Sequence, residues 1–127
     1  MIADLPAVEA LIDRALQLDE GYDHGVIHSF LIAYESSRPG RKGDPAERSR
    51  QHFQRAMDLS SGLMASPLVS LAEAVSIVKQ DRAEFQSLLN RALAIDVNAK
   101  PEWRLANLAM QHRARWLLSR VDELFVD

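Results

Sequence analysis

Residues 101–127 read PEWRLANLAMQHRARWLLSRVDELFVD, and this stretch decides the fold. It contains no glycine, and its only proline is the first residue, so it predicts one long helix of about six or seven turns. Apolar residues recur at intervals of three and four and predict one apolar stripe along this helix. The stripe comprises Trp103, Ala106, Met110, Ala114, Leu117, Val121 and Leu124.

The same stretch carries a second apolar strip and a polar face. The strip comprises Leu105, Ala109 and Trp116. The polar face holds Arg104, Asn107, Gln111, Arg115 and Asp122. A helix that lies on a core needs only one apolar stripe. Two stripes therefore predict neighbours on two sides, either two helices of the same fold or one helix and another subunit. We expect both tryptophans to be core residues rather than a platform for a ligand.

Five shorter helices are predicted upstream from apolar residues at helical spacing. They cover Leu5–Leu18, Tyr22–Ser37, Asp44 to about Ser60, a segment that starts at Ser66-Pro67 and runs past Val78, and Asp81–Ile95. Asp44 and Asp81 are predicted N-caps, and the prolines at positions 45 and 67 suit first helical turns. The Ser61-Gly62 pair is predicted to end the third helix. The loop SSRPGRKG, residues 36–43, is the one obvious long break. No segment alternates with a period of two, so no strand is predicted.

Three of these helices end in a common pattern, an Arg-Ala pair followed by aliphatic residues. The segments are DRALQLD at 13–19, QRAMDLS at 54–60 and NRALAID at 90–96. Their alanines, Ala15, Ala56 and Ala92, are 41 and 36 residues apart, near the ~34-residue period of tetratricopeptide repeats. We therefore predict an all-α fold of six helices, with three helical hairpins in a tetratricopeptide-like right-handed superhelical array and a long C-terminal helix. One domain would span residues 1–127. A generic antiparallel helical bundle is the alternative.

Composition excludes several classes of function. The chain of 127 residues has a net charge of -3 and no cysteine, which excludes disulfides, thiolate metal sites and cysteine nucleophiles. It lacks the sustained basic face of nucleic-acid binders, although residues 38–55 carry a local net charge of +4. No apolar run approaches the roughly 20 residues of a membrane span. MIADLPAVEA at the start is not a secretory signal, so we expect either a cytoplasmic protein or a mature or truncated form.

No arrangement of residues predicts catalysis, a cofactor or a metal. His24 and His28 stand four residues apart, on one helical face, but a zinc site needs a third ligand and a supporting shell. We expect His28 to be a hydrogen-bonded, half-buried residue instead. His52 and His112 are isolated in the sequence and predict no catalytic triad. The glycines of the 36–43 loop lack the spacing of a phosphate-binding loop.

The most suggestive polar pattern is the series Arg104, Asn107 and Gln111 on one stripe of the last helix. In a helical stack this series could face three residues of the second helix and the loop after it, His28, Tyr34 and Arg38. Repeat arrays bind partners on a concave side, so these six residues form our predicted binding site. Two alternatives are a wet helix surface and a polar network that sets the helix register.

Four blocks of the sequence resemble the T component of TRAP transporters. The blocks are Tyr22-x-x-Gly25-x-x-His28-x-Phe30 with Tyr34-Glu35-x-x-Arg38-Pro39, His52-Phe53-x-x-Ala56-x-x-Leu59-Ser60, Gln80-Asp81-Arg82-x-x-Phe85-x-x-Leu88-Leu89, and Arg104-Leu105-x-Asn107-x-x-x-Gln111-x-Arg113-Ala114-x-Trp116-Leu117-Leu118. The resemblance covers nearly the whole chain and corresponds to the later part of a typical member. It implies a periplasmic helical-repeat protein that associates with the substrate-binding protein of a TRAP uptake system. An apolar small ligand is a further expectation from the resemblance.

Three hypotheses of function follow. The first is a non-catalytic scaffold and binding protein, by resemblance the T component, with self-association into a homo-oligomer through the last helix. The second is a small-molecule binder or minor enzyme with its site between the hairpins, which a closed apolar cavity with converging polar groups would favour. The third is a cytoplasmic adaptor unrelated to transport.

Overall fold

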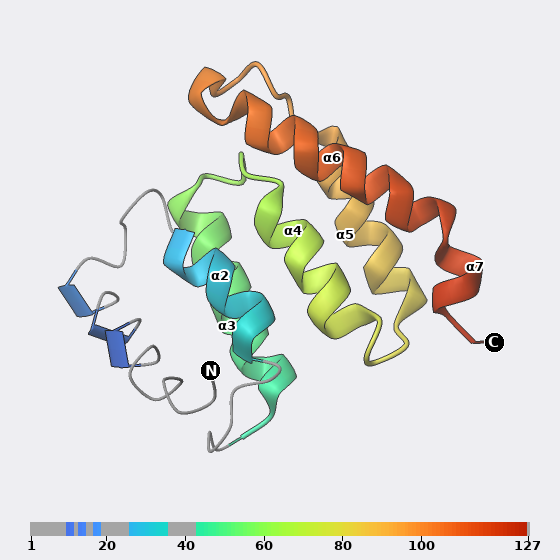
Figure 1. The fold of residues 1–127 in the computed structure, drawn as a ribbon, viewed down its shortest axis with the longest axis horizontal. Coiled ribbons are helices and arrows are strands. Elements are labelled where there is room, and N and C mark those ends of the chain that lie inside the picture. Colours follow the sequence, from blue (N-terminus) through green and yellow to red (C-terminus); the bar gives the residue numbers. More distant parts are fainter. Residues whose placement is uncertain (1–9, 12, 15–16, 19–25, 36–42, 127) are drawn as a thin grey trace.

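The computed structural model describes residues 10–11, 13–14, 17–18, 26–35 and 43–126 (Figure 1). Every regular element in this part of the chain is helical, which confirms the all-α prediction. The α-helices are α2 (Val26–Tyr34), α3 (Pro45–Leu59), α4 (Ser66–Leu71), α5 (Arg82–Ala94), α6 (Arg104–Ser119) and α7 (Val121–Leu124). A π-helical turn, η4 (Ala72–Ser76), extends α4, and a 3-10 turn, η5 (Pro101–Trp103), precedes α6. The predicted first helix and the predicted loop lie mostly outside the described residues.

Local signals place most of the helix ends correctly. Asp44 caps α3, because its Oδ1 accepts a hydrogen bond from the Ala46 amide at 3.0 Å. Asp81 caps α5 in the same way, accepting from the Glu84 amide at 3.0 Å. α3 ends at the Ser61-Gly62 pair, where φ is 55° and 71° and the backbone is left-handed. Both predicted caps and this predicted stop are confirmed.

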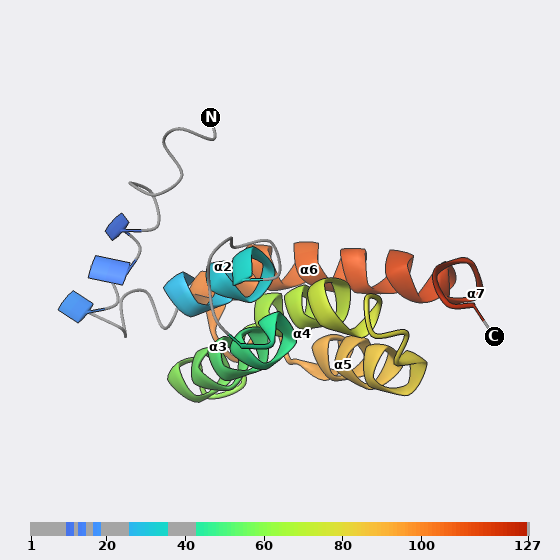
Figure 2. The same ribbon diagram turned by 90° about the horizontal axis from the view of Figure 1, so that it is seen from below.

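The helices pack as neighbours along the chain. α2 packs against α3, α4 against α5, and α5 against α6, while α4 also contacts α2 and α6. Figure 2 shows α3 and α5 on one side of the molecule and α2 and α6 on the other, with α4 between them. This arrangement is compatible with stacked hairpins, and the right-handed superhelix stays a prediction. No helix of the described residues is both long enough and apolar enough to cross a membrane.

One continuous apolar core joins α2, α3, α4, η4, α5 and α6. Ala56 of α3 and Ala92 of α5, two of the three predicted repeat alanines, are buried in their helices; Ala15 lies outside the described residues. Phe85 is fully buried at the centre and meets the Phe125 ring edge-on, with 4.9 Å between ring centroids. The other fully buried large aliphatic residues in the described part are Leu31, Ile32, Leu68, Val69, Val75 and Leu89.

The prediction of one uninterrupted helix over residues 101–127 is wrong. The stretch begins with the 3-10 turn η5, and the helix breaks at Arg120, whose φ of -108° and ψ of 12° are not helical. After the break, α7 makes one short turn, and the chain leads Phe125 back onto Phe85. Burying the Phe125 ring removes a large apolar area from water, which a straight helix would have left exposed.

Two predicted faces are also corrected. On α6, Ala106 is exposed, whereas Asn107 and Gln111 of the predicted polar face are buried. Val78, placed within the fourth predicted helix, lies in the turn after η4 and is 75% exposed. The π-helical turn η4 explains Val78, because a wider turn rotates the residues that follow it away from the face that an α-helix would give them.

Candidate functional site

Asn107 acts as a cap for a different helix. Its side chain is only 2% exposed, and its Oδ1 accepts a hydrogen bond from the Ala65 amide at 2.9 Å. Its Nδ2 donates to the Leu63 carbonyl at 2.8 Å. Ala65 is the N-cap residue of α4 and has no side-chain oxygen to offer. Asn107 therefore supplies from α6 the acceptor for the N-cap amide that a Glu or Gln at the third helical position supplies in a capping box.

Gln111 plays the matching part at the end of α5. Its Nε2 donates to the carbonyls of Ala92 at 3.1 Å and Ile95 at 2.9 Å. These carbonyls lie at the C-terminal end of α5, where Ile95 is the C-cap residue and the Ala92 carbonyl otherwise accepts a 3.4 Å hydrogen bond from the Ile95 amide. Arg104 lies apart from this pair on the exposed surface, where its Nε donates to Asn98 Oδ1 at 3.1 Å. The sequence allowed three interpretations of this polar series: a binding site, a wet surface and a polar network that sets the helix register. Asn107 and Gln111 fit the polar network.

Two further residues of the predicted site, His28 and Tyr34, lie on α2. His28 is buried, and its Nδ1 lies 2.8 Å from Nδ1 of His52. The Glu35 carboxylate is 2% exposed; it accepts from Arg48 Nε at 2.7 Å and lies 3.6 Å from His52 Nε2. The expectation of a hydrogen-bonded His28 is confirmed, but the residue is buried rather than half-buried. His52, which stands alone in the sequence, lies against His28 and Glu35. Tyr34 is half-buried on the same helix.

The described members of the predicted site therefore do not meet on one surface. His28 belongs to the contact of α2 with α3, while Asn107 and Gln111 belong to backbone caps made by α6. Arg38 lies outside the described residues. No group of three His, Cys, Asp or Glu side chains in the described ranges is placed to hold a metal ion.

A second polar network joins α3, η4 and α5. Arg50 donates twice to the Glu84 carboxylate, at 2.5 and 3.2 Å, and the buried Ser76 hydroxyl donates to Glu84 Oε1 at 2.6 Å. Burial of Glu84 alone would raise its pKa, but the hydrogen bonds from Arg50 and Ser76 outweigh this effect and lower the pKa of Glu84. The hydrogen bond to Glu84 raises the pKa of Arg50. Both groups are therefore ionised near neutral pH and hold the three elements together.

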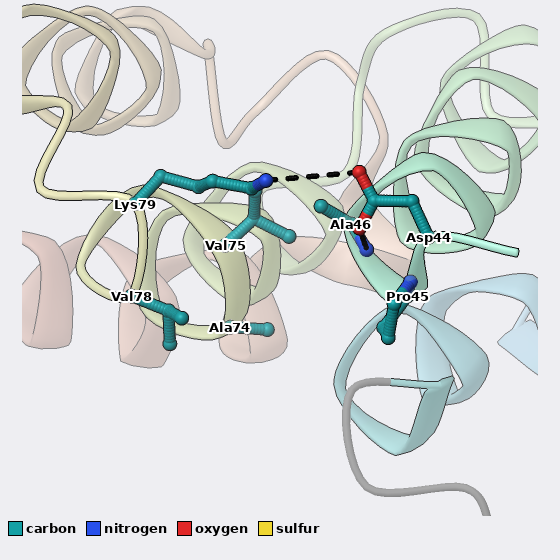
Figure 3. A pocket seen from close by; sticks show the side chains of 7 residues that line it. All are labelled: Asp44, Pro45, Ala46, Ala74, Val75, Val78 and Lys79. Atoms are coloured by element: carbon teal, nitrogen blue, oxygen red, sulfur yellow. Dashed lines mark hydrogen bonds and ion pairs between the residues drawn. The ribbon is translucent and has the colours of Figure 1, made fainter.

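A pocket of about 510 Å³ opens between the start of α3 and η4 (Figure 3). Its wall is mostly apolar and is formed by Pro45, Ala46, Ala74, Val75 and Val78. An ion pair stands at its rim, where Lys79 Nζ lies 3.6 Å from Asp44 Oδ2. Sequence reasoning found the cap role of Asp44 but missed this pocket, because its two walls are separated by about 30 residues of chain.

The outward face of α6 is an exposed apolar feature of the described surface. We define this face as Leu105, Ala109, His112 and Trp116, which recur at helical spacing and are all exposed. Leu105 is 82% exposed and Trp116 is 50% exposed, so the expectation that Trp116 is a core residue is wrong. The expected second strip of α6 does lie on one side of the helix, but no described helix covers it.

Arginines surround the Trp116 ring on this face. The guanidinium carbons of Arg113 and Arg120 lie 5.9 and 5.2 Å from the ring centroid, in the range of cation–π contacts. Arg113 is also held by two hydrogen bonds to Glu73, at 2.5 and 2.7 Å. The Trp116 ring therefore lies between two arginine side chains, and half of its surface is exposed to solvent. This arrangement is typical of residues that anchor protein interfaces.

Comparison with known proteins gives two matches. A family model described as TRAP transporter T-component matches residues 1–125. An uncharacterized protein of Treponema pallidum (strain Nichols) is 30% identical over 121 residues, which cover 95% of this chain and 38% of that protein. The chain thus spans well under half the length of this relative.

Proposed function

The chain belongs to the TRAP transporter T-component family, and from this premise we propose that it is a non-catalytic binding protein whose partner is the substrate-binding protein of a TRAP uptake system. On the same premise we place it on the periplasmic side of the membrane, where a substrate-binding protein would meet it. Side chains that converge in the described structure make caps and ion pairs between helices. These contacts support a scaffold rather than a reaction centre.

The observation that carries this proposal is the outward face of α6. Soluble proteins rarely leave a large aromatic residue and a large aliphatic residue exposed along one helix without a use for them. Leu105 and Trp116 are three turns apart on α6, so together they offer a partner an apolar contact about 16 Å long. Trp and Arg are the residue types most enriched among interface hot spots.

Charge indicates what kind of surface would fit. α6 contains three arginines and no acidic residue, in a chain whose net charge is -3. Arg104 and Arg115 are exposed on one flank of the outward face, and Arg113 and Arg120 lie on the other. We therefore propose that the partner presents an apolar centre with acidic residues around it, because complementary charges speed encounter and set orientation.

The test is a binding titration with the purified substrate-binding protein of the same TRAP system, in which biolayer interferometry measures the affinity and the association rate. We expect Trp116→Ala to weaken affinity by about 30-fold, since truncating a hot-spot residue costs about 2 kcal/mol or more. Val126→Ala is the matched control, because Val126 is an exposed apolar residue outside α6. Higher ionic strength should slow association. Absence of binding would refute the partner, whereas binding that Trp116→Ala leaves unchanged would refute only the assigned face.

Self-association through the same face is the competing outcome. Sedimentation velocity on the wild-type chain and on Trp116→Ala separates the two cases. If the wild type forms a homo-oligomer that the variant abolishes, and the substrate-binding protein does not bind, then a second copy of the chain covers the outward face instead.

Ligand binding is a second proposed function, and the pocket between α3 and η4 is the observation that favours it. Its volume of about 510 Å³ lies in the range of small-molecule sites, and its wall is predominantly apolar. A solvent-exposed valine, Val78, borders it. Titration of the isotope-labelled protein with 1-pentanol should shift the backbone amide signals of Ala46 and Val75. No shift at these amides would contradict this second function.

A further inference from the structure

We infer that the pocket between α3 and η4 takes a short aliphatic zwitterion, a molecule of the α-amino-acid class with a small apolar side chain. This inference rests on the second proposed function, ligand binding at this pocket. The geometry behind it is the close placement of one cation and one anion at the rim of an otherwise apolar cavity. Figure 3 shows both side chains reaching across the pocket mouth towards each other.

The apolar wall limits the ligand's tail. Pro45 and Ala46 line the α3 side, and Ala74, Val75 and Val78 line the side of η4 and the turn after it. These side chains are short and carry no polar atoms that could bind a second polar group. A small aliphatic group would bury its surface against them, at about 25 cal/mol per Å² of apolar area removed from water.

The rim determines the ligand's charges. Lys79 Nζ and Asp44 Oδ2 are 3.6 Å apart, and their side chains are 49% and 55% exposed. A simple anion would draw Lys79 away and leave its own charge facing the Asp44 carboxylate. A simple cation would pair with Asp44 and leave its own positive charge facing the Lys79 ammonium. A zwitterion gives its carboxylate to Lys79 and its ammonium to Asp44, so all four charges stay compensated.

The rim can open at small cost to the fold. Half-exposed ion pairs contribute little to stability, so separating Lys79 from Asp44 disturbs little. The cap of α3 also survives, because Asp44 holds the Ala46 amide through Oδ1 and pairs with Lys79 through Oδ2. The opposite wall belongs to a π-helical turn, a conformation often retained at functional sites.

Four probes with similar five-carbon skeletons test the inference by separating charge from apolar contact. They are norvaline, pentanoate, pentylamine and 1-pentanol, each titrated into the full isotope-labelled chain while the amide signals of Ala46, Val75 and Lys79 are followed. Norvaline should bind about two- to fivefold more tightly than each of the other three, the ratio that one exposed ion pair supplies. If 1-pentanol or pentanoate binds as tightly as norvaline, the zwitterion is refuted while ligand binding stands. If no probe shifts these signals, both are refuted.

A charge-matched pair of variants assigns the effect to the rim. Lys79→Gln should reduce norvaline affinity by about two- to fivefold and leave 1-pentanol unchanged. Arg91→Gln removes the same charge from the exposed surface of α5 and should leave both affinities unchanged. Equal loss of norvaline binding in the two variants would show a net-charge effect and overturn the assignment.

Discussion

Replacing Asn107 by alanine should lower the free energy of unfolding, although the sequence predicts that this position is part of a polar binding face. The change removes the acceptor of the buried Ala65 amide and the donor to the Leu63 carbonyl. A buried amide left without a partner costs about 1–3 kcal/mol, and the half-buried carbonyl adds about 0.5–1 kcal/mol. Alanine's higher helix propensity offsets about 0.5 kcal/mol. The expected loss is therefore about 1–3.5 kcal/mol in the free energy of unfolding.

Urea unfolding followed by far-ultraviolet circular dichroism measures this loss. The slope of the free energy against urea should stay constant, because the variant exposes the same surface when it unfolds. Asn90→Ala is the matched control: Asn90 is an exposed asparagine inside α5, so the same chemical change should be neutral or slightly stabilising.

The two variants decide between a cap and a binding residue. If Asn107→Ala unfolds at the same urea concentration as Asn90→Ala, the hydrogen bonds to Ala65 and Leu63 do not stabilise the junction of α4 with α6. The polar series of α6 would then return to the role of a binding surface. A loss in the expected range, with unchanged affinity for the partner, supports the cap.

Three other perturbations test the core, the charge network and the absence of metal. Ala56→Leu should lower the free energy of unfolding by about 1–3 kcal/mol, because the buried position leaves no room for the larger side chain. Ala94→Leu, at an exposed position of α5, should change the free energy of unfolding by under about 0.5 kcal/mol. Equal urea midpoints for the two variants would argue against close helix packing at Ala56. Glu84 has a lowered pKa in the folded protein, so the stability it contributes is present above its ordinary value of 4.5 and is lost as pH falls through the folded value. Below about pH 4.5, the melting temperature should therefore fall more steeply with decreasing pH for the wild type than for Glu84→Gln. Equal slopes of melting temperature against pH would mean that Arg50 does not stabilise the ionised carboxylate. Adding Zn²⁺ should leave the melting temperature unchanged, and a clear rise would indicate a metal site that includes His28.

Short-range rules predicted the helix boundaries well because their causes are local. Asp44 accepts from an amide two residues away and Asp81 from one three residues away, so the sequence around each carries the whole signal. The Ser61-Gly62 pair ends α3 by its own left-handed backbone. These features are confirmed without any knowledge of what packs against them.

The candidate surfaces could be predicted only in part. The repeat of Leu105, Ala109 and Trp116 showed that α6 has a second apolar strip, but periodicity orders the faces only relative to one another. Backbone groups at the start of α4 and at the end of α5 need hydrogen-bond partners, and the side-chain amides of Asn107 and Gln111 on α6 provide them. This requirement turned the polar stripe inward and left Trp116 in water.

The amino-acid sequence by itself determined that the described chain is helical, where most helices begin and end, and that Ala56 and Ala92 lie at close helix contacts. It could do so because caps, prolines, glycines and apolar spacing act within a few residues. Only the tertiary structure decided which side of α6 is buried, where the last helix breaks, and that Asp44 meets Lys79 at a pocket. Those outcomes depend on groups about 30 to 45 residues apart, whose hydrogen bonds, ion pairs and ring contacts exist only once the helices have packed.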